Sequence, residues 1–175
     1  MDLRLKLPLE AHHQFQGATN DCAPFTTAMV IGAILGRPVD GRQLAAQMNR
    51  PRWRWGPLPH PVIRRIPNWA TFPWGVVDIL RLNGIRARWR FGASEADLFL
   101  ALEQDRIAMP IVGEFSPLWA HIKPLVAHDR VKGWGFVDPG QREVLSWQSH
   151  GAFRKHWSNW RNLLVETLEP VRRGG

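Results

Sequence analysis

The chain contains a single cysteine, Cys22, within the stretch QGATNDCAPF that runs from Gln16 to Phe25. One thiol excludes an internal disulfide scaffold and a cysteine-rich zinc site. A thiol in a model peptide has a pKa of about 8.5 and is mostly protonated at neutral pH, but a helix N-terminus lowers that pKa because its unpaired N–H groups favour negative charge. Cys22 stands at the start of a predicted helix. The position suits a reactive thiolate, although most cysteines are small buried side chains.

A catalytic cysteine also requires an imidazole that takes its proton and a further group that orients the imidazole. His121 and Asp138 offer this pair in the second half of the chain. His121 begins one predicted strand and Asp138 ends the next, so a β-hairpin would place the two side chains next to each other. Each also has an ordinary alternative: His121 is one of seven histidines, and an aspartate before Pro139 is typical of a turn.

The element that must position the thiol is a helix predicted from Cys22 to Gly36. Its apolar residues recur at spacings of three and four, and Gly36 followed by Pro38 ends it. Asn20 or Asp21 would cap its N-terminus. Because this helix is mostly apolar, we expect it to be the buried central helix of the fold.

The rest of the chain segregates helices from strands. Helices are predicted over 42–48, 75–84, 94–104 and 150–157, and strands over 3–8, 85–91, 106–115, 120–130, 133–138, 142–147 and 162–169. This order predicts an α+β fold, papain-like, with a central N-terminal helix packed on a C-terminal antiparallel β-sheet. A chain of 175 residues is long enough for one domain, over 1–175, and too short to expect two.

Residues 49–75 form a segment rich in proline, tryptophan and arginine inside this domain. The prolines argue against regular structure, and a loop of this length is usually a lid or a binding loop. Arg52, Trp53, Arg54 and Trp55 interleave guanidinium and indole groups, which suits stacking on anionic or aromatic ligands. We therefore expect Trp53 and Trp55 to contact substrate. The alternative is a hydrophobic flap that only covers a helix.

From Gln16 onward the chain resembles the papain-like cysteine peptidases, and specifically the bacteriocin-processing (double-glycine leader) peptidase family. The resemblance rests on QGATNDCAP (16–24) before an apolar helix, on AHIKPLVAHD (120–129), and on GFVDP (135–139). A helix, a short strand, a second helix and an apolar strand separate the first block from the second, as in the family. The resemblance covers roughly residues 14–140.

This resemblance implies a role for each matching residue. Cys22 would be the nucleophile, and His121 its general base and later its acid. Asp138 would orient the imidazole, and the Gln16 amide would line the oxyanion hole together with the Cys22 backbone N–H. The leading hypothesis is a cysteine peptidase, or a related thiol amidohydrolase, that cleaves a peptide or amide bond through an acyl-enzyme on Cys22. It implies a peptide or protein substrate and neither a cofactor nor a metal.

Three features depart from the family pattern. Ala23 follows the cysteine where the family usually has glycine, and the residue is still small. Trp119 lies just before His121, where the family favours glycine, and a bulky indole there would narrow the groove and contact substrate. The segment 49–75 has no counterpart in the family, and it would either set specificity or block access.

Two other classes of function stay open. A non-catalytic papain-like module that binds through segment 49–75 is the main alternative. The net charge of +8 suits nucleic acid or an anionic surface, but only that one segment concentrates the basic residues, so a nucleic-acid binder is less favoured. A metal site built from Cys22, His121 and His128 is disfavoured, because an odd spacing on one strand directs the two histidines to opposite faces.

The N-terminal stretch has no apolar core of the kind found in signal peptides, and no apolar run approaches the roughly 18 residues needed to span a bilayer. A lone free thiol also suits a reducing compartment. We therefore expect a cytoplasmic protein without a membrane segment.

Overall fold

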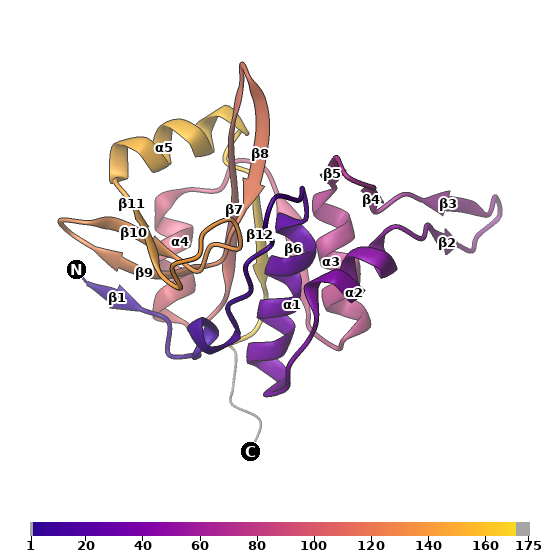
Figure 1. Cartoon of the computed structure of the whole chain (residues 1–175), viewed down its shortest axis with the longest axis horizontal. Helices are drawn as coiled ribbons and strands as arrows, with labels where there is room; N and C mark the ends of the chain where they lie inside the picture. Colours follow the sequence, from indigo (N-terminus) through magenta and orange to yellow (C-terminus); the bar gives the residue numbers. More distant parts are fainter. Residues whose placement is uncertain (1, 171–175) are drawn as a thin grey trace.

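A computed structural model describes residues 2–170 of the chain (Figure 1). The helices in this part are η1 (Leu9–His12), α1 (Cys22–Leu35), α2 (Gly41–Met48), α3 (Pro73–Leu82), α4 (Glu95–Glu103) and α5 (His150–Asn159). The strands are β1 (Leu3–Arg4), β2 (Arg52–Arg54), β3 (His60–Val62), β4 (Arg65–Ile66), β5 (Ala70–Thr71), β6 (Ala87–Arg90), β7 (Ala108–Phe115), β8 (Leu118–Ile122), β9 (Leu125–Asp129), β10 (Gly133–Phe136), β11 (Ser146–Gln148) and β12 (Leu164–Thr167).

The strands other than β2 to β5 form two four-stranded antiparallel sheets, in the orders β1-β9-β10-β11 and β6-β12-β7-β8. Helices together with antiparallel sheets confirm the predicted α+β fold. The prediction of one strand over 120–130 was wrong, because this stretch contains parts of two strands that belong to different sheets. β8 ends at Ile122 and β9 begins at Leu125. Pro124 lies between them and has no N–H to donate to a ladder, so the chain leaves one sheet there and enters the other.

Helix α1 is the central element, as predicted. All of its residues from Ala23 to Ala33 are buried, and it ends at Gly36, whose left-handed φ of 64° suits glycine. In Figure 1 it lies in the middle of the molecule, with α2 and α3 on one side and the larger strands on the other. A buried hydrogen bond of 3.0 Å from Thr26 Oγ1 to the Ile122 carbonyl ties the helix to the end of β8.

The prediction of irregular structure over 49–75 was wrong for part of that segment. β2 pairs with β3 and β4 pairs with β5 in two small antiparallel hairpins, and α3 begins at Pro73 within the same range. A two-stranded ribbon has only edge strands, where proline is tolerated, so Pro61 can lie in β3. The β2–β3 hairpin projects away from the body of the protein (Figure 1).

Candidate active site

Cys22 is the first residue of α1, where the backbone N–H groups of the first turn are unpaired within the helix. The residue as a whole is partly buried, its thiol hydrogen-bonds to His121, and the backbone N–H groups of Ile122 and Ala23 also point to the sulfur. Burial raises the pKa of the Cys22 thiol, but the hydrogen bond and charge of His121 with the two N–H groups outweigh it and hold that pKa below its ordinary value.

His121 is held between Cys22 and Asp138. Its Nε2–H donates to Asp138 Oδ1 at 2.6 Å, and the other ring nitrogen is left for the Cys22 sulfur. Burial alone would lower the pKa of His121, but the hydrogen bonds to Asp138 and Cys22 and the charges of both groups raise it to about 9. The three side chains therefore favour ionisation of the thiol beside an imidazolium whose second N–H is bound by a carboxylate.

The Asp138 carboxylate is itself buried and well supplied with donors. Burial raises its pKa, but the hydrogen bond and charge of His121, the charge of Lys123 and the Gly140 N–H lower it to about 2. The Gly140 N–H donates to Oδ1 at 2.8 Å, and Lys123 Nζ lies 3.5 Å from Oδ2. A Cβ at Gly140 would lie 3.1 Å from Asp138 Oδ1 and 3.3 Å from His121 Cε1, so glycine allows the turn to approach the pair closely.

Lys123 is a member of this cluster that sequence reasoning missed. It is 8% exposed, and its Nζ lies 4.4 Å from the centre of the Phe136 ring as well as beside Asp138. Burial lowers the pKa of Lys123, and Asp138 only partly compensates for this. The sequence could have indicated Lys123, because side chains two residues apart lie on the same side of an extended chain. Lys123 stands two residues after His121.

Gln16 lies in a segment that runs beside the turn carrying Asp138. The Gln16 N–H donates to the Pro139 carbonyl at 2.8 Å, and His13 Nε2 lies 3.1 Å from the Asp138 carbonyl. The Gln16 side chain donates from Nε2 to the Thr19 carbonyl at 2.8 Å. The Gln16 Oε1 is buried and has no hydrogen-bond partner among the described residues. The place of this amide in an oxyanion hole stays a prediction.

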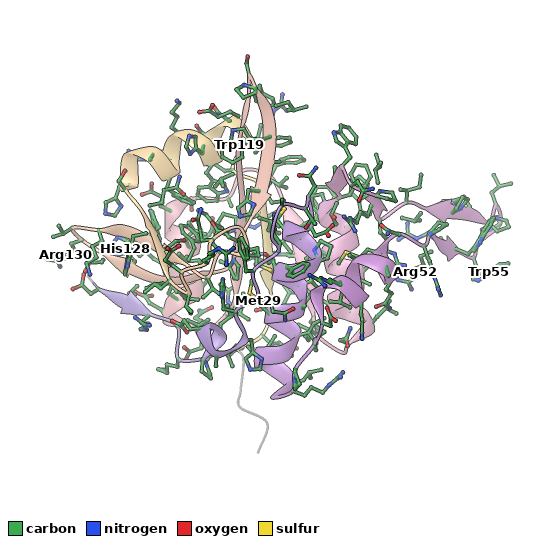
Figure 2. All side chains as sticks on the ribbon, viewed as in Figure 1. Met29, Arg52, Trp55, Trp119, His128 and Arg130 are labelled. Atoms are coloured by element: carbon green, nitrogen blue, oxygen red, sulfur yellow. The ribbon has the colours of Figure 1, made fainter. Side chains whose placement is uncertain are left out.

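The three tryptophans expected to bind substrate do not gather at one place. Trp119 lies on β8 two residues before His121, and therefore on the same side of the strand. Its indole packs edge-on to His156 at 5.5 Å between ring centres. Trp53 and Trp55 lie on or next to β2, and Figure 2 shows Trp55 at the outer end of the projecting hairpin, well apart from Trp119. Trp55 is 82% exposed. Their binding role stays a prediction.

Within residues 2–170, no group of three or more His, Cys, Asp or Glu side chains has an arrangement that could hold a metal ion. The reason given for disfavouring a metal site from Cys22, His121 and His128 was wrong, because the two histidines lie on different strands, β8 and β9, and not on one. His128 is buried against the rings of Phe99 and Trp134.

No protein-family model matches the sequence, and no curated protein matches it. A solved structure from Bacillus anthracis, provisionally named a C39-like peptidase, matches this chain with a TM-score of 0.71 at 14% sequence identity. The match covers 98% of this chain and 100% of that chain. The chain has the fold of a C39-like peptidase. Within this C39-like fold, no helix of residues 2–170 has the length and apolar character required to cross a membrane.

Proposed function

We propose that this protein is a cysteine peptidase, or a related thiol amidohydrolase, with Cys22 as its nucleophile. One observation carries the proposal: the Cys22 thiol, the His121 imidazole and the Asp138 carboxylate form a continuous hydrogen-bonded series at the N-terminus of a buried helix. A structural histidine does not need a lone thiol on one nitrogen and a buried carboxylate on the other. The C39-like fold and the resemblance to bacteriocin-processing peptidases support a peptide substrate.

In the proposed reaction, the Cys22 thiolate attacks the carbonyl carbon of the scissile bond and forms a C–S bond. The electron pair of the carbonyl moves to its oxygen, giving a tetrahedral oxyanion. The His121 imidazolium then gives its proton to the leaving nitrogen, the C–N bond breaks, and a thioester remains on Cys22. Water attacks the thioester while neutral His121 takes its proton, which releases the acid and restores the thiolate–imidazolium pair.

The oxyanion would be bound by the Cys22 backbone N–H and by the Gln16 amide. The helix N-terminus supports this role, since its N–H groups favour negative charge. An amide NH₂ has two N–H donors, and the Thr19 carbonyl takes one from Gln16, which leaves one that the oxyanion would use. The anchoring of the Gln16 backbone to Pro139 connects this donor to the turn that carries Asp138, so both would move together.

Alkylation by iodoacetamide, followed by mass spectrometry, tests the proposal directly because Cys22 is the only cysteine. We expect stoichiometric labelling that is faster at pH 7 than that of free cysteine, since more of the thiol is ionised. His121→Ala should slow labelling toward the free-thiol rate. Labelling no faster than free cysteine, or undiminished in His121→Ala, would count against an activated nucleophile and favour the non-catalytic binding module.

A second test measures hydrolysis of a mixed peptide library by the wild-type protein and by Cys22→Ala. We expect the wild-type protein to cleave library members and Cys22→Ala to cleave none. A cytoplasmic location also stays a prediction, and a lone reduced thiol supports it.

A further inference from the structure

Asp21, which directly precedes the nucleophile, occupies the N-cap position of α1 without acting as a side-chain cap. Its carbonyl accepts from the Phe25 N–H at 3.1 Å, but its carboxylate makes no hydrogen bond to the first turn. Asp21 is therefore the N-cap residue, as one of the two expected candidates, but its carboxylate does not supply the cap. An aspartate at this position normally uses its carboxylate for the helix N–H groups, so another partner must hold it.

That partner is Arg65, on strand β4 of segment 49–75. The Arg65 guanidinium forms a salt bridge to the Asp21 carboxylate, and the two side chains are only 2% and 16% exposed. Arg65 also donates to Asn49 Oδ1 at 3.3 Å. A second contact joins the same two segments, since Asn20 Nδ2 donates to the Asn68 carbonyl at 2.9 Å in the β4–β5 turn. The hairpin therefore holds both residues that precede Cys22.

Asp21 directly precedes Cys22 in the chain, and consecutive Cα atoms are about 3.8 Å apart, so we expect a net charge at Asp21 to act on the thiolate. An unpaired carboxylate so near would oppose ionisation of the thiol. A buried ion pair presents little net charge to its neighbour, whereas removing one partner leaves a buried charge uncompensated. The backbone between Asp21 and Cys22 also includes the Cys22 N–H that would bind the oxyanion.

We propose that Arg65 is a positioning residue of the active site, through which the β4–β5 hairpin holds the start of α1 and cancels the carboxylate charge next to Cys22. Segment 49–75 would then be a working part of the active site and not only a surface for substrate. The inference rests on the proposed function only in taking Cys22 as the nucleophile.

Other titratable groups lie at this thiol or behind His121, and the test must hold them constant. His121 contacts it from β8, Asp138 and Lys123 lie behind His121, and His13 contacts the Asp138 carbonyl from the segment before α1. None of these four residues is bonded to Arg65 or Asp21. Substitutions at the Arg65–Asp21 pair therefore change one electrostatic contribution to the thiol and leave the others in place.

The experiment is a double-mutant cycle that removes the charge of Arg65, of Asp21 and of both. The measured quantity is the pKa of Cys22, obtained from the pH dependence of its alkylation rate. Arg65→Met leaves Asp21 unpaired and should raise the pKa of the thiol by about one pH unit. Asp21→Asn leaves Arg65 unpaired and should lower it by a similar amount. The double variant should return it to near the wild-type value, because neither charge remains. A merely structural role would shift both single variants in the same direction.

Two matched arginines provide controls. Arg64 is the adjacent buried arginine, but it bonds to Asp78 and to the carbonyls of Gln47 and Arg50 and not to α1. Arg64→Met should lower the melting temperature without moving the pKa of Cys22. Arg86→Met removes an exposed ion pair with Glu169 and should change neither quantity.

The result that would overturn the proposal is a thiol pKa that does not move in opposite directions in Arg65→Met and Asp21→Asn. If Arg65→Met does not fold, Asp21→Asn and the double variant still decide the matter, since the first must lower the pKa and the second must restore it. The readout needs no substrate. A protein that cleaves no peptide but shows these pKa shifts would refute the proposed function and leave this inference standing.

Discussion

The His121 imidazole and the Asp138 carboxylate lie 2.6 Å apart although their chain segments belong to different sheets. His121 is on β8, the edge strand of β6-β12-β7-β8, and Asp138 follows β10 of β1-β9-β10-β11. The candidate active site thus forms where the two sheets meet the N-terminus of α1. Its geometry depends on three elements at once, which makes it sensitive to small changes at that junction.

Asp138→Asn tests the carboxylate behind the imidazole. In the wild-type protein we expect a bell-shaped pH profile of kcat/KM, with activity rising as the thiol ionises below its ordinary pKa and falling as His121 loses its proton near pH 9. Asp138 raises the pKa of His121, so the amide should move the basic limb to lower pH. It should also lower kcat by on the order of 10²–10⁴, by analogy with triad enzymes. A basic limb that stays near pH 9 would show that Asp138 does not control the imidazole.

Lys123→Met tests the buried ammonium beside Asp138. Lys123 partly cancels the carboxylate charge that stabilises the His121 imidazolium, so removing it should move the basic limb of the pH profile upward. Methionine can keep the packing on the Phe136 ring because it is similarly long and unbranched. Lys123→Arg, which keeps the charge, should leave the limb nearer the wild-type position. A downward shift in Lys123→Met would contradict this electrostatic role.

Gly140→Ala tests the close approach of the turn to the His121–Asp138 pair. The added Cβ would lie 3.1 Å from Asp138 Oδ1, so the pair must give by a few tenths of an ångström. We expect kcat/KM to fall about tenfold, because small misplacements of catalytic groups are costly. Gly151→Ala is the matched control, since a Cβ there meets nothing within 4 Å, and its kcat/KM should be unchanged. Equal activity in both variants would mean that the turn adapts freely.

Peptides of different length can distinguish the contribution of Trp119 to substrate binding from that of Trp55. Trp119 shares a strand side with His121, so Trp119→Ala should change KM for short peptides while leaving kcat nearly unchanged. Trp55 lies at the outer end of the β2–β3 hairpin, so Trp55→Ala should raise KM only for long peptides or proteins that reach it. Steady-state kinetics on peptides of increasing length provides the measurement. An effect of Trp55→Ala on the shortest cleaved peptide would instead require the hairpin to fold back toward Cys22.

Much of the local structure could be predicted because its causes are local. Apolar spacing and Gly36 set the bounds of α1, and the same pattern placed Cys22 at its start. The proline-rich segment 49–75 was harder, because its two hairpins depend on contacts outside the segment, such as Arg64 with Asp78 and Arg65 with Asp21. Composition reports none of those partners.

By itself, then, the sequence determined that a lone thiol stands at a helix N-terminus and that Gln16, His121 and Asp138 stand in an order suited to thiol chemistry. Only the tertiary structure decided that the chain changes sheets at Pro124, that Lys123 is buried behind Asp138, and that Arg65 holds Asp21. The physical reason is the range of the interactions. Helix boundaries follow from neighbouring residues, whereas contacts between distant side chains depend on how whole elements pack, and no local pattern encodes that packing.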